Sequence, residues 1–424
     1  MRLGLALALS MMLCCQQRLV AQEMDVFKKH LAELVSEKYH GRGYAQYGAL
    51  KAAYYLEEAY AASGLEVTSQ DFRVDINTFP SHASMSVDGK ALVAGDDFSM
   101  REFSPGAHGR HKLLFIDTQN YDSLKVREWI QQPENEGAFG VIDFYYPRTQ
   151  GNDALFREKG AWQQSLLSGM IYTFKDPMKY YKAYGDVVEK KPIVWATESS
   201  VTPSSRQIEI DVDNVFLDQC PARNVMARLK GNGKSDSTIV FVAHYDHLGV
   251  FGQDLYFPGA NDNASGTAML LMLADYYSHQ PQLDYDLVFL SVSGEEANLR
   301  GSTYFAEHPL VDLDKIRYLI NLDMIGDDCP DLYCEVGEEG ERGFMLFEAL
   351  NKKLGGFKSL ARSPLASNSD HWPFAQKGVP CIFLMNENGS AYPYYHTYHD
   401  TLETMSMASV KPVFELVKAF LAAY

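Results

Sequence analysis

The sequence predicts an α/β fold with a mostly parallel, mixed central sheet, helices on both faces, and an inserted β-rich module. Two observations support this prediction. From residue 238 onward, apolar runs of strand length alternate with helical segments, which is typical of a sheet covered on both faces. Between residues 92 and 210 the sequence becomes aromatic-rich and irregularly spaced, with only short apolar runs.

The expected elements follow in chain order. Apolar residues at helical spacing predict an N-terminal helix over 48–63, which ends before Gly64. In the C-terminal half we expect strands at 238–243, 286–292, 317–323 and 379–384, and helices at 264–279, 301–308, 343–354 and 409–423. The inserted module contributes expected strands at 112–117, 140–146 and 192–197. We therefore assign 22–91 and 211–424 to the sheet domain, and 92–210 to the module.

Composition excludes two classes of partner. The chain has 424 residues, enough for two or three domains, and the composition of a folded globular protein. It carries 38 basic and 55 acidic residues, a formal net charge of −17. Because so acidic a protein repels nucleic acid and anionic membrane surfaces, neither is expected as a partner.

Residues 1–21 have the layout of a secretory signal peptide. An N-terminal arginine is followed by an apolar run up to Cys15 and then by a small residue, Ala21. We expect cleavage after Ala21 and a secreted or periplasmic protein. Lipid attachment at Cys14 or Cys15 is the less favoured alternative. The run is too short to span a bilayer, which takes about 20 residues, and no later stretch predicts a transmembrane helix.

Four cysteines follow the signal peptide. Cys329 and Cys334 lie in one short loop that contains proline, and an oxidising compartment would favour a disulfide between them. Two free thiols are the alternative. The scattered spacing of all four argues against a zinc–thiolate site.

Metal-capable side chains follow the predicted strands at the point where each strand ends. His244 and Asp246 follow the first strand, and Glu295-Glu296 follow the second. Asp262 opens a helix, Asp323 ends the third strand, and His396 precedes the last helix. The carboxyl ends of parallel strands share one edge of a sheet, where ligands bind. We therefore expect these side chains to meet.

Two imidazoles and three carboxylates could hold two metal ions if one carboxylate is shared. Nitrogen and oxygen donors without thiolates suit Zn²⁺, with Mn²⁺ or Co²⁺ as substitutes. In the Glu295-Glu296 pair, one carboxylate could bind metal while the other accepts a proton from the attacking water. Asp246 is placed to hold the far ring nitrogen of His244.

Each of these signals is weak by itself. An isolated Glu-Glu pair is usually a solvated surface feature, and Asp262 could serve only as a helix cap. Asp323 could hold a turn, and His396 could be a surface histidine. The metal interpretation depends on the ordered set, in which each member follows a strand or opens a helix.

At this level of detail the chain resembles the co-catalytic di-zinc aminopeptidase family, whose superfamily also includes glutamate carboxypeptidases and glutaminyl cyclases. The similarity covers residues ~25–75 and ~220–424. Its motifs are HGRGYAQYGALKAAYYLEEAYAASGLE (40–66), AHYDHLG (243–249), GANDNASG (259–266), SGEEANLRGS (293–302), NLDMIG (321–326), SDHWPFAQKGVP (369–380) and HTYHDT (396–401).

The resemblance implies a set of residue roles and a di-zinc exopeptidase fold. Asp262 would bridge two zinc ions, with Glu296 and His396 on one and His244 and Asp323 on the other. Glu295 would be the general base, Asp246 would orient His244, and Asp370 resembles a supporting carboxylate of the family. Residues 22–91 and 211–424 would form the zinc peptidase domain. Through EGAFGVIDF (136–144) and PIVWAT (192–197), the module resembles a protease-associated domain, with an unrelated insertion as the alternative.

The implied reaction is hydrolysis of the peptide bond next to a free N-terminus, with peptides as substrates. Tyr392, Tyr394 and Tyr395 are candidate hydrogen-bond donors to the oxyanion, and the sequence does not choose among them. Three rivals remain: a glutaminyl cyclase with one zinc, a carboxypeptidase or dipeptidase that uses Arg300 to hold a carboxylate, and an inactive relative that only binds.

Overall fold

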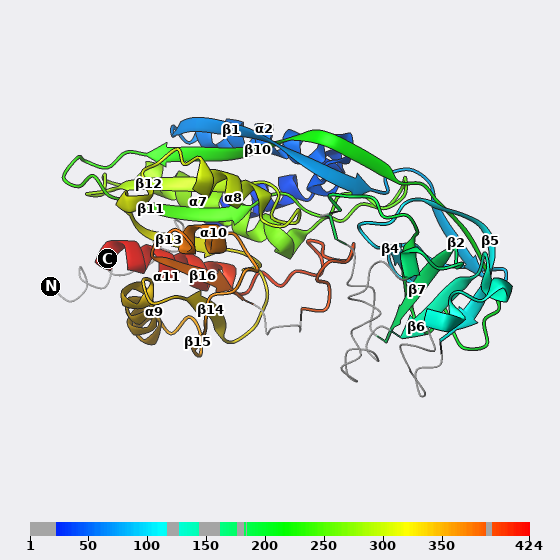
Figure 1. Ribbon diagram of the computed structural model, residues 1–424. Coiled ribbons are helices and arrows are strands. Elements are labelled where there is room, and N and C mark those ends of the chain that lie inside the picture. Colours follow the sequence, from blue (N-terminus) through cyan, green and yellow to red (C-terminus); the bar gives the residue numbers. More distant parts are fainter. Residues whose placement is uncertain (1–22, 117–126, 144–161, 176–181, 184, 387–391) are drawn as a thin grey trace.

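The structure, a computed structural model, describes residues 23–116, 127–143, 162–175, 182–183, 185–386 and 392–424 (Figure 1). The predicted signal peptide lies outside these residues. The described part of the chain forms two eight-stranded sheets.

The larger sheet is mixed, as predicted. Its central strands are mutually parallel, whereas antiparallel strands flank them on both sides. In spatial order it contains β1 (Glu66–Thr78), β10 (Val215–Leu229), β12 (Asp286–Val292), β11 (Thr238–His244), β13 (Ile316–Leu322), β16 (Cys381–Met385), β14 (Leu332–Val336) and β15 (Leu360–Ser363).

Helices cover both faces of this sheet. On one face, Phe241 of β11 packs in a cluster with α2 (Gly48–Ala62), α7 (Gly266–Ser278), α9 (Glu341–Leu354) and α11 (Val410–Ala423). On the other, Val240 and Val242 pack with α8 (Arg300–Glu307) and α10 (His371–Ala375). Every residue of β11 is buried, which explains its unbroken apolar run. Burial of each large apolar side chain contributes about 1.5–3 kcal/mol.

The four strands and five helices predicted for this domain are confirmed to within a few residues. Apolar runs do not mark β14, β15, α10 or the long antiparallel pair β1–β10, which were not predicted. In β1, Phe72, Val74 and Ile76 are buried and alternate with the more exposed Arg73 and Asp75. This period of two is the signal of a strand with one buried face.

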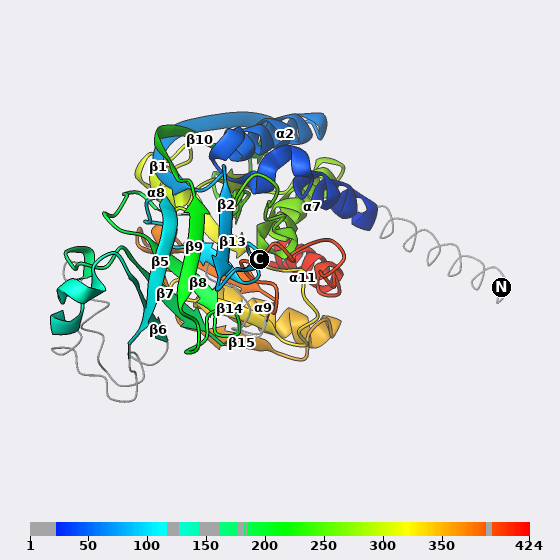
Figure 2. The same cartoon turned by 90° about the vertical axis from the view of Figure 1, so that its right-hand side faces the viewer.

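The second sheet is built from residues between 83 and 212 (Figure 2). Its spatial order is β3 (Lys90–Ala91), β2 (Ala83–Val87), β9 (Gln207–Val212), β5 (Ala107–Phe115), β6 (Phe139–Asp143), β7 (Gly169–Phe174), β8 (Ile193–Thr197) and β4 (Phe98–Met100). The strands expected near 112, 140 and 192 are present as β5, β6 and β8.

The ribbon β1–β10 joins the two sheets, and Figure 1 shows both strands continuing past the large sheet toward the second. Thr78 pairs with Val215 at the far end of this ribbon. The second sheet also packs against the loop that follows β11. Phe251 of that loop makes edge-to-face contacts with Phe79 and Phe98, with ring centroids 6.1 and 5.8 Å apart.

Polar contacts reinforce this junction. Asp96 accepts hydrogen bonds from the hydroxyl group of Tyr398 (2.5 Å) and lies 2.9 Å from Nε2 of His399. Asp186 forms an ion pair with Arg300 at 2.9 Å. Tyr398 and His399 follow His396, and Arg300 follows the Glu295-Glu296 pair, so the second sheet touches the surroundings of the predicted site.

Two further sequence expectations bear on the described residues. Both Cys329 and Cys334 have free thiols, which matches the alternative without a disulfide. Among the described helices, none combines the length and the apolar character needed to cross a bilayer.

Candidate metal centre

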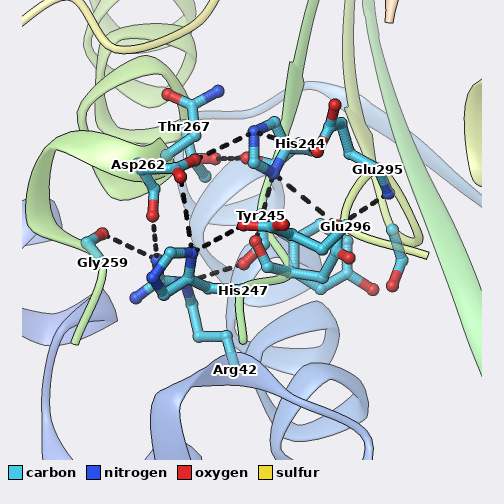
Figure 3. A network of polar contacts seen from close by, with 12 residues as sticks. Arg42, His244, Tyr245, His247, Gly259, Asp262, Thr267, Glu295 and Glu296 are labelled. Carbon is cyan, nitrogen blue, oxygen red and sulfur yellow. Dashed lines mark hydrogen bonds and ion pairs between the residues drawn. The ribbon is translucent and has the colours of Figure 1, made fainter. Parts of the chain in front are cut away.

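The five predicted metal ligands converge at the carboxyl edge of the large sheet. His244 ends β11, Glu296 follows β12, and Asp323 follows β13. Asp262 lies in the irregular turn η4 (Ala260–Ser265) that leads into α7, and His396 lies in the loop before α11. All five side chains are buried. Figure 3 shows His244, Asp262 and Glu296 grouped there.

Four distances describe two clusters that share Asp262. Nε2 of His244 lies 3.5 Å from Oδ1 of Asp262 and 3.4 Å from Oδ1 of Asp323. Nε2 of His396 lies 3.3 Å from both Oδ2 of Asp262 and Oε2 of Glu296. Ligands at 2.0–2.1 Å in a tetrahedral zinc site are separated by roughly 3.3–3.4 Å. The observed spacing therefore fits two such sites, with one oxygen of Asp262 in each.

The chemistry of these groups also fits a divalent cation. Oδ1 of Asp323 is buried and has no hydrogen-bond partner among the described residues. Burial alone would lower the pKa of His396, but the carboxylates of Glu296 and Asp262 raise it to about 10. Similarly, Asp323 and Glu295 overcome the effect of burial and raise the pKa of His244 well above its ordinary value. The cluster therefore attracts positive charge.

Two of the predicted ligands, Asp323 and His244, are held from behind by a second contact. Oδ2 of Asp323 accepts a hydrogen bond from Ser369 (2.7 Å), whose hydroxyl group accepts one from Asn321 (2.8 Å). The Nδ1 atom of His244 lies 3.1 Å from the backbone carbonyl oxygen of Asp246. Such contacts fix the ring and carboxylate orientation that a metal ion requires.

His247 is a functional candidate that the sequence analysis missed. Its fully buried ring places Nδ1 3.0 Å from Oε1 of Glu296, whereas the distance to Oδ2 of Asp262 is 3.9 Å. The short contact is a hydrogen bond that leaves Oε2 of Glu296 facing His396. His247 therefore supports a ligand, although a group of His247, Asp262 and Glu296 is itself compact enough to hold an ion. The available signal was its position three residues after His244.

Asp246 lies beside His244, but its closest contact to that ring is made by its backbone. Its carboxylate is 3.8 Å from Nδ1 of His244 and accepts a hydrogen bond from the backbone N–H of Glu295 (3.2 Å). The hydroxyl group of Tyr44 donates a further, long hydrogen bond to it (3.4 Å). The carboxylate thus connects the loop after β11 to the loop that carries Glu295.

Glu295 occupies the open side of the cluster. Its side chain is 15% exposed, compared with 5% for Glu296, and its Oε2 atom is 3.9 Å from Nε2 of His244. Burial raises its pKa well above the ordinary value; His244 opposes that shift, and the nearby carboxylate of Glu296 adds to it. A glutamate with a raised pKa and access to solvent holds a proton more readily than an ordinary one, which suits a group that accepts and returns a proton.

The sequence model of peptidase family M28 matches residues 224–421, which contain all of these groups. The matched residues, called the M28 domain below, make up just under half of the chain and are similar to peptidase family M28. The chain is 29% identical over 208 residues to "Aminopeptidase YwaD" of Bacillus subtilis, a match that spans 47% of this chain and 44% of that protein. It thus covers less than half of that relative's length.

Two further similarities extend beyond the M28 domain itself. The chain is 25% identical over 265 residues to a glutaminyl-peptide cyclotransferase of Drosophila melanogaster, across 53% of this chain and 73% of that protein. The solved structure titled as BSAP, a zinc aminopeptidase from Bacillus subtilis, aligns with a TM-score of 0.67 over 93% of both chains. At 20% identity, this last similarity establishes the fold.

The tyrosines near His396 in the M28 domain have different surroundings. Tyr392 donates a hydrogen bond to the buried Asp400 (2.7 Å), which gives it a structural partner. Tyr395 stacks on the His396 ring, with centroids 3.9 Å apart. Although 39% of the residue is exposed, desolvation of its hydroxyl group and the carboxylates of Asp262 and Glu296 raise its pKa well above the ordinary value. The hydroxyl group therefore keeps its proton beside the cluster.

Asp262 lies in a tightly constrained turn. Gly259 has φ +57°, and a Cβ there would lie 2.2 Å from the carbonyl oxygen of Asp262 and 2.4 Å from the His247 ring.

Asp370, the predicted supporting carboxylate, is fully buried, and burial raises its pKa to about 7 although the charge of His244 opposes this.

Proposed function

We propose that the protein is a zinc-dependent aminopeptidase that holds two zinc ions. His244 and Asp323 would hold one ion, His396 and Glu296 the other, and Asp262 would bind both. The observation that carries this proposal is the set of four ligand-to-ligand distances of 3.3–3.5 Å, divided between the two oxygens of Asp262. The relatives described as aminopeptidases support the same reaction.

When bound, the zinc ions would supply Lewis-acid polarisation of the scissile carbonyl and lower the pKa of the attacking water. In our proposal Glu295 accepts a proton from that water and passes it to the leaving amine. The hydroxyl group of Tyr395 donates to the developing oxyanion. The acidic surroundings suit the ammonium group of a free peptide N-terminus.

The environment of Arg300 argues against the carboxypeptidase alternative. That activity would need an arginine free to hold a substrate carboxylate. Arg300 instead forms an ion pair with Asp186 at 2.9 Å. The cyclase alternative requires one zinc ion, whereas the donor groups here form two clusters around Asp262.

We also propose that the protein is exported by residues 1–21, and that the second sheet, residues 83–212, is the inserted module, similar to a protease-associated domain. The pairing of β2 with β3 and β9 supports drawing the module from residue 83. Export would place the enzyme among extracellular or periplasmic peptides.

The test combines zinc analysis with hydrolysis of a panel of aminoacyl chromogenic substrates. We expect close to two zinc ions per chain and release of N-terminal residues. Glu295→Gln should keep its zinc and lose kcat by about 10²–10⁴-fold, whereas the control Glu307→Gln, at the exposed end of α8, should behave like the wild type. One zinc with cyclisation of N-terminal glutamine would support the cyclase instead. Near-wild-type turnover by a zinc-loaded Glu295→Gln variant would exclude the base.

A further inference from the structure

A fully buried guanidinium group lies directly beneath the metal centre. Arg42 ends the short helix η1 (Glu37–Arg42), far from the M28 match in sequence, and its side chain is completely shielded from solvent. Figure 3 shows it pointing up toward His247 and Gly259. Buried arginines usually pair with carboxylates. Arg42 instead donates all five of its observed hydrogen bonds to backbone carbonyl oxygens.

These carbonyl groups belong mostly to the two loops that supply the ligands. Nε donates to Tyr245 (2.7 Å), between His244 and His247 in the first loop. The two terminal nitrogens donate to Pro258 (2.5 Å), Gly259 (2.8 Å) and, weakly, Asp262 (3.4 Å) in the second loop. One further bond reaches Leu34 in the N-terminal segment (3.0 Å).

The backbone around Arg42 is fitted to the same loops. Its carbonyl oxygen accepts a hydrogen bond from the backbone N–H of His247 (3.2 Å). A Cβ at Gly41 would lie 2.3 Å from the carbonyl oxygen of Gly249, and one at Gly43 would lie 2.3 Å from its Cα. Because nothing larger than glycine fits on either side, the backbone at Arg42 is held closely against the loop that follows β11.

Arg42 also contributes charge. Burial lowers the pKa of its guanidinium group to about 10, while the carboxylates of Asp400, Asp262 and Asp246 act in the opposite direction. The group therefore stays cationic at neutral pH. A fixed positive charge under a cluster of buried carboxylates lowers the cost of keeping the ligands ionised.

We propose that Arg42 is a positioning residue for the metal centre, which sets the spacing between the His244 loop and the Asp262 loop. The proposal rests on the proposed zinc site. Lysine keeps the charge but has three donors on a single nitrogen, so it cannot reproduce a planar fork that reaches both loops. Methionine fills similar space with no charge and no donor. The order of metal affinity should therefore be arginine, then lysine, then methionine.

The experiment measures zinc affinity by competition with a chelator, and the visible spectrum of the Co²⁺-substituted protein, for wild type, Arg42→Lys and Arg42→Met. We expect zinc binding to weaken by about 10–100-fold in Arg42→Lys and further in Arg42→Met, with a changed Co²⁺ spectrum. Leu56→Ala is the matched control, because Leu56 is a fully buried residue of the neighbouring α2 in the apolar cluster. It should lower the free energy of unfolding and leave both metal readouts unchanged.

Two results would overturn the proposal, and they are distinguishable. If wild type binds two zinc ions and Arg42→Lys binds them equally tightly with the same Co²⁺ spectrum, Arg42 has only a folding role. If wild type binds no zinc, the proposed metal centre fails and this role fails with it. Should Arg42→Met not fold, the comparison of Arg42→Lys with Leu56→Ala decides.

Discussion

Asp400 offers the sharpest test of how the turn that carries Asp262 is held. Its fully buried carboxylate accepts hydrogen bonds from the backbone N–H of Asn261, at 2.9 and 3.1 Å to its two oxygens, and from the backbone N–H of Asp262 at 3.0 Å. It also accepts one from the hydroxyl group of Tyr392 (2.7 Å). Asp400→Asn replaces one of these acceptor oxygens with an amide NH₂ group of nearly the same shape.

The expected cost follows from these contacts. Oδ1 is the acceptor for Tyr392, so the amide nitrogen of the variant would be directed at the N–H of Asp262, donor against donor. Losing one hydrogen bond to a charged group costs about 1.5–3 kcal/mol. Burial raises the pKa of Asp400, so asparagine recovers part of the desolvation cost. We expect a net loss of about 2 kcal/mol in the free energy of unfolding, and zinc affinity about 10–100-fold weaker because the Asp262 backbone shifts.

The assay is urea unfolding of the metal-free protein together with zinc competition. Tyr392→Phe serves as the control, since it also removes one hydrogen bond to the same carboxylate, about 1.5–3 kcal/mol, but leaves the N–H groups of Asn261 and Asp262 paired. Equal zinc affinity in Asp400→Asn and Tyr392→Phe would refute the reasoning. It would mean that the turn keeps its shape without the carboxylate.

The other predictions concern single contacts. Tyr395→Phe should lower kcat by about 10²-fold and leave KM and zinc content nearly unchanged; a normal kcat would exclude oxyanion donation. Burial lowers the pKa of His30 to about 4, so between pH 6.5 and 4 the unfolded chain takes up a proton that the folded chain does not. Over this range the free energy of unfolding of wild type should fall by on the order of 1–2 kcal/mol relative to His30→Gln. Parallel pH–stability curves of the two proteins would contradict this. A Cβ at Gly343 would lie 2.2–2.5 Å from the ring and hydroxyl group of Tyr318. Although alanine favours helices, Gly343→Ala should therefore lower the free energy of unfolding by about 1–3 kcal/mol, measured by urea unfolding. A stabilised variant would show that the ring can move.

The parts of the fold that the sequence predicted are those with an unambiguous hydrophobic pattern. The runs at 238–243 and 286–292 are apolar on both faces, so their assignment as buried parallel strands needed no tertiary information. Because β11, β12 and β13 are parallel neighbours, His244, Glu296 and Asp323 had to emerge at one edge. The ordering of ligands along the chain was therefore enough to predict their convergence.

Contacts between segments that are distant in the chain could not be predicted from the sequence. Arg42 and Asp400 are each more than a hundred positions from Asp262 in the sequence. Their side chains bind backbone groups of the Asp262 turn, and backbone groups leave no pattern of residue types in a sequence. The same limit applies to Asp246. Its spacing from His244 predicted a carboxylate contact; the carboxylate lies 3.8 Å from Nδ1 of that ring, and the closer contact with the backbone carbonyl oxygen, at 3.1 Å, was not predicted.

The ribbon that joins the two sheets has a consequence for how the protein could have been assembled or could be shortened. The chain leaves the ribbon at Thr78 and returns at Val215, two residues paired across the strands, so a tight turn could close the ladder and preserve the large sheet without residues 79–214. Side-chain packing opposes that excision. Leu248, Phe251 and Phe257 would lose their apolar cover, and they belong to the loop between His244 and Asp262. By its topology, the second sheet is an insertion that the strand order of the large sheet does not require. By its packing, it supports the loop between two of the candidate metal ligands.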